Sequence, residues 1–555
     1  MKALKVVFLW HMHQPDYRDA ETGEFVLPWV YLHALKDYSD MAAHLESHPK
    51  MRAVVNFVPS LVDQLDDYRR QFETGTFRDP MLALLGRPDF DTLDDGERRL
   101  IVERCFHANQ ATMIEPFAPF RHLYEIHKQA LETKSAFDFT PAMLADLITW
   151  YNLSWIGEIE RRNSPVFAEL SKKGQDFTAA DRLRLRAYIG SVVSGIIPRY
   201  RALAERGQIE LSATPFSHPL APLLISFSSA RDATPSIDLP NVPDYPGGAE
   251  RVRAHLTQAR AAHAAWFGST PEGIWPAEGA VSESLLKLLA EADVRWTATS
   301  AAVLANSLRT GPSRAPMEDE ELYHGYRVAN APGPVVFFRN EKLSDLIGFE
   351  YRSWWAGDAA RDFVSRLEAI RARIPVGETR VVSVILDGEN AWEYFPYNGF
   401  FFFRELYARL ENHADIEPAT FSGYLAAHPG AERHVHRLAA GSWVYGNFRK
   451  WIGTPDKNRA WELLCAAKQT YDLFCAAGAP PDTERILRGC ESSDWFWWFG
   501  DFDPNGAVSA FDALFRRNLR ALYRALGEAP PAALAEPVSH GGGAPESHGA
   551  MQRST

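Results

Sequence analysis

The chain has 555 residues, a formal net charge of −12 and a sequence pI near 5.9. A chain of this length can bury a large core and form more than one domain. The acidic balance disfavours nucleic-acid binding, which rewards a basic surface, and is compatible with an uncharged polymer as ligand. The 16 tryptophans are a high number, and indole rings either pack in a core or stack on the apolar faces of sugars.

The N-terminal segment does not resemble a signal peptide. Its apolar run, residues 3–10, ends in His11-Met12-His13-Gln14 with no small-residue cleavage site. No apolar stretch approaches the ~20 residues that span a bilayer. The four cysteines are scattered and form no CxxC motif. We therefore expect reduced thiols and a cytoplasmic protein that binds neither membrane nor nucleic acid, while the oligomeric state stays unknown.

Seven short segments have the pattern of buried strands. Each is a β-branched or apolar run bounded by polar or turn residues, and most are followed by a helical pattern. This alternation predicts an α/β fold with a parallel sheet, open or closed as a barrel, and chemistry at the carboxyl ends of the strands. The predicted strands are residues 4–10, 52–58, 208–213, 272–276, 294–299, 334–338 and 380–386.

The regions between and after these strands predict the domain organisation. Residues 60–205 are largely helical by pattern and form a predicted insertion in a catalytic barrel that spans residues 1–403. Helical patterns dominate again over residues 404–527, which predicts a C-terminal helical domain. Residues 528–555 are rich in Ala, Pro and Gly and predict a disordered tail.

Two histidines, His11 and His13, follow the first predicted strand. At spacing i, i+2 on a strand end they face the same side, where they could bind a metal or a ligand. The alternative is a pair of histidines satisfied by backbone groups. A metal site needs further ligands, and the HxD arrangement is missing because Asp16 lies beyond Pro15.

The third predicted strand and its loop contain Glu210 and His218. A carboxylate within a buried strand needs a partner, so we expect Glu210 to form an ion pair with a neighbouring strand rather than to act in catalysis. His218 falls in the loop, where a scaffolding role and a ligand contact are equally compatible with the sequence.

Two carboxylates occupy positions typical of catalytic groups. Glu278, in Trp275-Pro276-Ala277-Glu278-Gly279, lies between a tryptophan and a helix start, and we take it as the candidate nucleophile. The alternative is a carboxylate stabilised by the helix dipole. Asp387 ends the strand 380–386, a favoured catalytic address in parallel sheets. The alternative is a turn, because Asp-Gly is common turn chemistry.

A dense aromatic and acidic stretch occupies residues 491–501 and includes Asp494 and Trp497. We favour a sugar-binding platform over a stripe of aromatic core. Paired carboxylates with such a platform suit glycosidic chemistry, in which one acid protonates the leaving oxygen and the other attacks the anomeric carbon or activates water.

In chain order, these clusters resemble the five sequence regions of the family 57 glycoside hydrolases. Residues 13–15 resemble the first region, 210–218 the second, 275–278 the third, 387–390 the fourth and 491–501 the fifth. Each motif is short, but five in the correct order are specific, and the resemblance runs from about residue 5 to 510. Arg339 and the triplet Gly441-Ser442-Trp443 are additional matches.

The resemblance implies a distorted (β/α)7 barrel, α-glucan substrates and a retaining double displacement that needs no metal. Position by position, it implies that Glu278 is the nucleophile and Asp387 the general acid/base. Ionised Glu278 is then expected to raise the pKa of Asp387 and keep it protonated. The residues implied to line the sugar subsites are His11, His13, His218, Trp275, Asp494 and Trp497.

Three alternatives stay open at the level of sequence. A 4-α-glucanotransferase or a branching enzyme would use the same two carboxylates, because water and a sugar hydroxyl compete for one covalent intermediate. A zinc-dependent mannosidase or deacetylase on a similar barrel would use His11, His13 and Asp387 as ligands. A glucan-binding protein without turnover would retain the scaffold alone.

Overall fold

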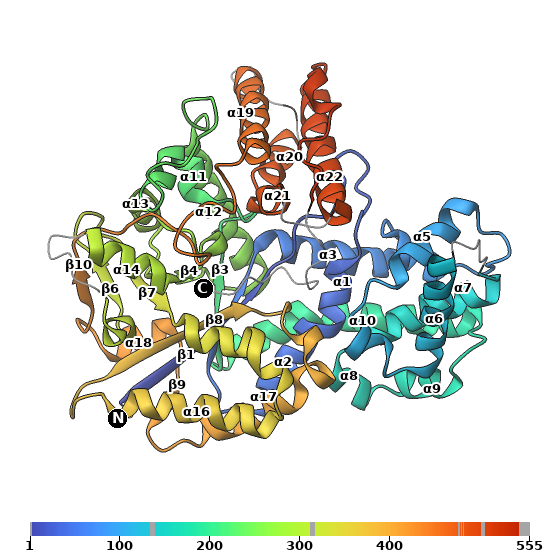
Figure 1. The fold of residues 1–555 in the computed structure, drawn as a ribbon, viewed down its shortest axis with the longest axis horizontal. Helices are drawn as coiled ribbons and strands as arrows, with labels where there is room; N and C mark the ends of the chain where they lie inside the picture. The colour runs from blue at the N-terminus through green and yellow to red at the C-terminus, as the bar shows by residue number, and fades with distance from the viewer. Residues whose placement is uncertain are drawn as a thin grey trace.

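A barrel with two helical additions makes up the structure (Figure 1). The computed structural model describes residues 3–133, 139–310, 317–475, 478, 480, 482–500 and 505–542. The helical insertion extends to the right of the barrel in Figure 1, and the C-terminal helices stand above it.

Within the described residues, seven parallel strands close into a barrel in the order β1, β2, β3, β4, β5, β7, β8. The β7–β8 pairing at Arg339 and Ser383 completes the ring. All seven predicted strands are confirmed, and the closed form decides between an open sheet and a barrel. The strands are β1 (Leu4–Met12), β2 (Ala53–Phe57), β3 (Ile209–Ala213), β4 (Gly273–Ile274), β5 (Trp296–Ser300), β7 (Val335–Arg339) and β8 (Arg380–Asp387).

The strand sequences are apolar on both faces because both faces are covered. Side chains such as Val7 and Leu9 of β1 point into the barrel core, while Phe8 and Trp10 pack in the larger cluster outside it. Helix α18 (Phe421–Ala427) closes one end of the barrel, where Phe421 stacks on Phe337 with ring centroids 4.4 Å apart.

Glu210 does not form the predicted ion pair. Its carboxylate accepts hydrogen bonds from Trp296 Nε1 at 2.6 Å, from Ser422 Oγ at 2.6 Å and from the Ser422 backbone N–H at 3.0 Å. Neutral donors therefore satisfy the carboxylate, and burial raises its pKa. Glu210 is the second residue of β3, so it lies at the amino ends of the strands, opposite the predicted site.

The predicted helical insertion between β2 and β3 is observed. Helix α10 continues through Pro198 without a break. It runs beside α3 and connects the insertion back to the barrel. The helices are α3 (Pro59–Thr74), α4 (Pro80–Leu85), α5 (Asp95–Cys105), α6 (Ala118–Thr133), α7 (Pro141–Ser154), α8 (Glu158–Asn163), α9 (Pro165–Lys173) and α10 (Ala179–Glu205).

The remaining helices cover the barrel or stand on its carboxyl face. Those beside the strands are α1 (Trp29–His33), α2 (Ser39–Ser47), α11 (Ala221–Ile225), α12 (Gly248–Phe267), α13 (Glu283–Glu291), α14 (Ala301–Thr310), α15 (Glu341–Asp345), α16 (Ala356–Ala372) and α17 (Phe400–Glu411). The C-terminal group is α19 (Pro455–Cys475), α20 (Thr483–Cys490), α21 (Ser493–Trp498) and α22 (Asn505–Ala525).

The sheet continues past the predicted domain boundary at residue 403. Strand β9 (Ile416–Pro418) pairs with β1, and β10 (Arg433–Val435) pairs with β6 (Tyr326–Val328), which in turn pairs with β7. These strands are three residues each, too short to give a clear period-two pattern. The part of the C-terminal region that is purely helical therefore begins with α19.

The tail predicted to be disordered from Glu528 is partly ordered. Leu534 and Val538 are buried, and the Val538 backbone N–H donates to Asp512 Oδ1 at 2.7 Å. These buried side chains and hydrogen bonds between the segment and α22 order residues 528–542 despite their Pro- and Ala-rich composition. Residues 543–555 lie outside the described part of the chain.

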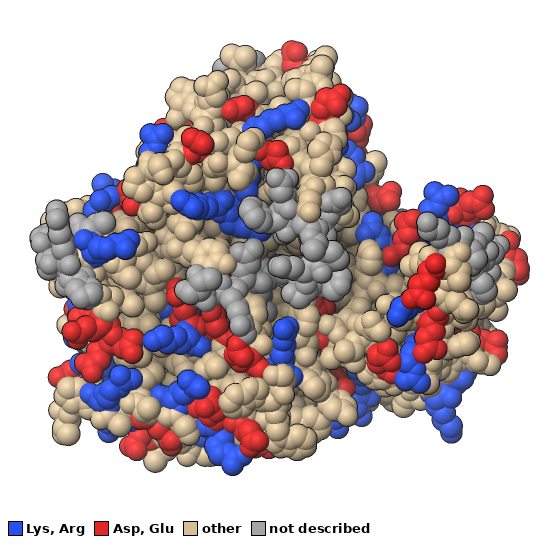
Figure 2. All heavy atoms as spheres, in the orientation of Figure 1, with Lys and Arg blue, Asp and Glu red and all other residues tan. Residues whose placement is uncertain are grey.

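No helix of the described residues could span a membrane, and the face seen in Figure 2 shows no segregation of charge. Among the helices of the described residues, none combines the length and apolarity needed to cross a bilayer. Lys and Arg are interspersed with Asp and Glu over the face seen in Figure 2. Such a mixed surface fits an uncharged ligand better than a polyanion.

A buried ion-pair network joins the C-terminal helices to the barrel helix α12. Glu491, fully buried, accepts from Arg251 Nε at 2.7 Å, contacts His255 Nε2 at 2.8 Å and accepts from Tyr245 Oη at 2.7 Å. Arg251 holds the pKa of Glu491 far below its usual range against the effect of burial. The network fixes the start of α21, two residues later, over the barrel.

Glu491→Ala is predicted to lower the free energy of unfolding by about 3–5 kcal/mol, because it leaves the buried Arg251 without its main partner. Glu484→Ala is the matched control, since Glu484 pairs with the same guanidinium but has a side chain that is 37% exposed. Thermal melts should show a much larger fall in Tm for Glu491→Ala. Equal falls for both variants would contradict the role assigned to this network.

Candidate active site

Both predicted catalytic carboxylates lie at the carboxyl ends of barrel strands. Strand β1 ends in His11 and Met12, and its register places His11 opposite Asp387, the last residue of β8. Strand β4 ends at Ile274, and Glu278 follows in the short 3-10 turn η4 (Ala277–Gly279). The parallel arrangement brings these ends to one rim, as the sequence predicted.

Glu278 is held in a backbone conformation that few residues adopt. Its φ of 59° and ψ of 22° lie in the left-handed region, which costs a non-glycine residue about 1–3 kcal/mol unless its surroundings impose it. The loop around Trp443 imposes it here. The Trp443 backbone N–H donates to Glu278 O at 2.9 Å, and residues 281 and 441 form an antiparallel bridge.

The Glu278 side chain is buried and has two hydrogen-bond partners. Trp443 Nε1 donates to Oε2 at 3.0 Å, and Ser493 Oγ lies 3.4 Å from Oε1. Burial raises the pKa of Glu278 to about 8, and the charges of Asp494 and Asp387 act in the same direction. The Trp443 and Ser493 contacts oppose this rise because they favour the ionised form.

His11 and His218 are buried and neutral. Burial lowers the pKa of His11 to about 3 and that of His218 well below its usual value, and the neighbouring His13 lowers both further. Neutral imidazole has one donor and one acceptor nitrogen. His11 Nδ1 donates to Asn56 Oδ1 at 2.7 Å, so its Nε2 accepts from His218 Nε2 at 3.2 Å.

The tautomers of the two histidines also affect Glu278, the candidate nucleophile, through Ser493. His218 Nδ1 becomes an acceptor and receives the hydroxyl hydrogen of Ser493 at 2.9 Å. When Glu278 is protonated, its own hydrogen can complete the contact to Ser493 Oγ. When Glu278 is ionised, the single Ser493 hydrogen can serve either Glu278 or His218. Ser493 therefore couples the protonation of Glu278 to the buried histidines.

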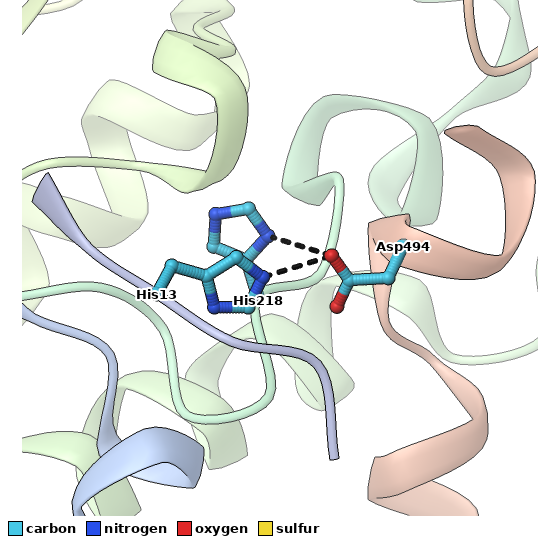
Figure 3. A group of neighbouring side chains, drawn as sticks. All are labelled: His13, His218 and Asp494. Atoms are coloured by element: carbon cyan, nitrogen blue, oxygen red, sulfur yellow. Dashed lines mark hydrogen bonds and ion pairs between the residues drawn. The ribbon is translucent and has the colours of Figure 1, made fainter. Parts of the chain in front are cut away.

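His13, His218 and Asp494 form a second cluster (Figure 3), and the charge of its Asp494 also acts on Glu278. His13 Nε2 lies 2.8 Å from Asp494 Oδ1, and the rings of His13 and His218 stack with centroids 3.7 Å apart. His13 Nδ1 is buried and has no hydrogen-bond partner among the described residues.

The ligand atoms of His13, His218 and Asp494 lie within 4.8 Å of one another, a spacing that could hold a metal ion. This set differs from the zinc alternative of the sequence, which combined His11, His13 and Asp387. His11 is excluded from it because its two ring nitrogens face Asn56 and His218. The direct contact between His13 and Asp494 would have to open to admit an ion.

Asp387 is partly buried at the end of β8. Burial raises its pKa, while a hydrogen bond from Asn390 Nδ2 at 2.8 Å and the charges of His13 and Arg339 lower it. Behind it, the buried Glu389 accepts from the His13 backbone N–H at 3.1 Å and from Gln14 Nε2 at 3.2 Å. Glu389 thus ties the end of β1 to the loop after β8.

Both candidate catalytic carboxyls have a raised pKa. Asp387 was predicted to hold a proton because ionised Glu278 repels its charge, and burial is the main cause of the rise in the pKa of Asp387. Burial also raises the pKa of Glu278, where the charges of Asp494 and Asp387 add to the rise. The site therefore disfavours ionisation of both carboxyls at once.

The aromatic residues of the fifth motif are mainly core, contrary to the platform we expected. Trp495 and Phe496 are fully buried, and Phe496 stacks on Trp461 with centroids 4.0 Å apart. Trp497 is 9% exposed and lies under Lys450, and only Asp494 of the predicted pair reaches the histidines. Successive side chains of an α-helix point about 100° apart, so the consecutive rings of the motif lie on different sides of α21.

Trp275 also lies beneath the site rather than facing it. Its ring is fully buried and packs against Trp443 at 5.3 Å and His11 at 6.1 Å. A buried indole has no face open to a ligand, so Trp275 supports the residues above it. Its place in a sugar subsite, implied by the resemblance, has no support in this conformation.

Three residues of the site were absent from the predicted set: Asn56, Trp443 and Ser493. Trp443 lies 165 residues from Glu278, and Asn56 is one polar residue inside a buried strand. A buried strand asparagine is itself a signal, because it needs partners there. Gly441-Ser442-Trp443 was noted as a match to the family but was assigned no role.

Glu278→Gln is predicted to stabilise the protein increasingly as pH rises. The folded-state pKa is about 8 against 4.5 for a free glutamate, so stability is lost as pH rises through this window. The gain at pH 9 is at most about 5 kcal/mol. Tm should exceed that of the wild type by a few degrees at pH 9 and by little at pH 5.

The exposed Glu320→Gln is the control for loss of one carboxylate. A difference in Tm between Glu278→Gln and wild type that does not change with pH would contradict the buried-carboxyl argument.

Comparison with known proteins gives a family and a fold. The structure is similar to the branching enzymes of Thermococcus kodakaraensis (TM-score 0.58, 16% identity) and Pyrococcus horikoshii (TM-score 0.57, 16% identity), with 95% of this chain and 90% of each of those chains covered. It is also similar to the α-amylase AmyC of Thermotoga maritima (TM-score 0.56, 14% identity, 95% and 93% covered). No curated protein shows a significant match to this chain.

At these identities the solved structures establish the fold, a (β/α)7-type barrel with a C-terminal helical region. The family comes from the sequence, because the model of glycosyl hydrolase family 57 matches residues 7–435, well over half of the chain. The chain belongs to glycosyl hydrolase family 57 and is an enzyme of glycosidic bonds.

Proposed function

We propose that this protein is a retaining glycoside hydrolase that acts on α-glucans through a covalent glycosyl-enzyme. The observation that carries the proposal is the pair of carboxyls at the carboxyl rim of one barrel, the buried Glu278 and the partly buried Asp387. Their charges influence each other, and histidines and a tryptophan surround them. Two carboxyls so placed are the minimum that double displacement requires.

In the proposed first step, Glu278 attacks the anomeric carbon while Asp387 protonates the leaving glycosidic oxygen. In the second step, Asp387 takes a proton from water, which attacks the same carbon and releases Glu278. Attack needs ionised Glu278 with protonated Asp387. Burial opposes the ionisation of Glu278, so the hydrogen bonds from Trp443 and Ser493, which stabilise its carboxylate, favour the form that attack needs.

The α-glucan substrate is inferred from family membership and from the activities named for the similar structures. The chemistry of the site is compatible with it. The side chains of His13 and Asp494 provide a ring nitrogen and a carboxylate of the kind that hydrogen-bond to sugar hydroxyls, and the mixed charge of the face seen in Figure 2 is compatible with an uncharged polymer. We infer cleavage of α-1,4 bonds, with α-1,6 bonds as a possible second linkage.

Transfer to a second glucan, as in a 4-α-glucanotransferase or a branching enzyme, would use the same dyad. Hydrolysis and transfer differ only in the molecule that attacks in the second step, which is water or a sugar hydroxyl. Residues other than Glu278 and Asp387 select that molecule. Longer or branched products from maltoheptaose would indicate transfer, while glucose and maltose alone would indicate hydrolysis.

Substitution of each carboxyl is predicted to distinguish the nucleophile from the general acid/base. Glu278→Ala and Asp387→Ala should each lower kcat on maltoheptaose at least ~10³-fold, because each removes a group that acts in the transition state. With 4-nitrophenyl α-maltoside and azide, Asp387→Ala should form the α-glycosyl azide, since the nucleophile remains. Glu278→Ala should form the β-glycosyl azide by direct displacement, as nuclear magnetic resonance of the products would show.

Glu210→Gln is the matched control, because Glu210 is a buried carboxyl at the opposite end of the barrel. Its activity should stay within about twofold of wild type, a difference of less than 0.5 kcal/mol. Full activity in Glu278→Ala or Asp387→Ala, or the same azide anomer from both, would contradict the assigned roles.

A further inference from the structure

We propose that Trp354 and Trp355 form a second glucan-binding platform at the rim of the barrel, apart from the catalytic dyad. This inference rests on the proposed function, since it takes the substrate to be an α-glucan. The platform would hold a neighbouring stretch of a long chain, while Glu278 and Asp387 act on the stretch in the site.

The two indoles are exposed to an extent that is rare in this protein. Trp355 is 80% exposed and Trp354 is 45% exposed, whereas Trp10, Trp275, Trp392 and Trp461 are fully buried. Exposed apolar side chains are common singly, but two adjacent large aromatic rings on one segment point to a binding role. An indole ring can stack on the apolar face of a glucose unit while its N–H stays available to a hydroxyl.

The segment that carries the indoles is anchored on both sides. The 3-10 turn η7 (Tyr351–Ser353) precedes it and α16 follows it. Tyr351 is buried, packs against Trp354 with centroids 5.4 Å apart, and donates from Oη to Asp362 Oδ2 of α16 at 2.6 Å. A platform fixed in this way loses little conformational entropy when it binds a sugar.

The platform lies on the catalytic side of the barrel. It belongs to the connection that leaves β7 at Arg339 and enters α16, so it follows the carboxyl end of a barrel strand. Arg339 donates to Ile385 O at 2.8 Å, lies over the Trp443 ring, and lowers the pKa of Asp387. One βα connection therefore starts at the catalytic site and ends in the two exposed indoles.

The polar surroundings favour a sugar over a protein as the occupant. Ser353 precedes the indoles, and Asp358, paired with Arg361, follows them. A stable protein interface needs about 800 Å² on each partner. Two indoles bordered by a hydroxyl and an ion pair fall short of that area, whereas flat rings with polar groups beside them suit a sugar, which stacks through its apolar face and hydrogen-bonds through the hydroxyls at its edge.

The test uses affinity electrophoresis in gels that contain amylopectin, with all variants in a Glu278→Gln background that prevents turnover. Trp355→Ala and the double variant Trp354→Ala/Trp355→Ala should bind amylopectin about fivefold or more weakly than the parent. Trp355→Phe should recover part of the binding. Val376→Ala, fully exposed beyond the other end of α16, is the control and should bind as the parent does.

In the active enzyme, the ratio of activity on amylopectin to activity on maltotriose should fall at least threefold in Trp355→Ala. Parent-like binding by the double variant would overturn the platform and leave the proposed function standing. Failure of the parent itself to bind amylopectin would overturn both. Conversion of an oligomer to a monomer by Trp355→Ala, seen by analytical ultracentrifugation, would show a self-association surface instead and overturn the platform.

Discussion

The removal of the Glu278 carboxyl from water is the constraint on which the rest of the site depends. Burial raises the pKa of this group to about 8 and would leave it protonated and inert if nothing opposed it. Trp443 and Ser493 oppose it from two segments that follow the main barrel strands in sequence. The strained backbone at Glu278 is the local consequence, since the Trp443 loop fixes both the main chain and the side chain of one residue.

The ionisation of Glu278 also depends on the C-terminal helices, because Ser493 lies at the start of α21. Ser493 reaches Glu278 only because the buried Glu491 is fixed to α12 and because the Ser493 N–H donates to His218 O at 2.9 Å. The chain of hydrogen bonds from Asn56 through His11 and His218 to Ser493 then links four separate parts of the sequence. Neutral imidazoles suit this chain, because charged rings of His11 and His218 would repel each other at a centroid distance of 5.3 Å.

The sequence was informative wherever a pattern was local. Seven strands, the helical insertion and the carboxyl-end placement of Glu278 and Asp387 all follow from short periodic runs. It was misleading where burial depends on distant segments. Glu210 accepts hydrogen bonds from neutral donors, one of them in α18, instead of forming an ion pair. The rings around Trp495 are part of the core, and Leu534 and Val538 of the Pro- and Ala-rich tail are buried against α22. The raised pKa of Glu278 was likewise out of reach, because it depends on how deeply distant segments bury this carboxyl.

The central claim, that Glu278 forms the bond to the sugar, can be tested by trapping. Incubation with a 5-fluoro-α-glucosyl fluoride, which slows the second step, followed by proteolysis and tandem mass spectrometry, would locate the attached sugar. The account predicts a hexosyl adduct on Glu278, absent from Glu278→Gln and lost slowly on addition of maltose. An adduct on Asp387 or Asp494, or turnover with retention of configuration and no adduct on Glu278, would contradict it.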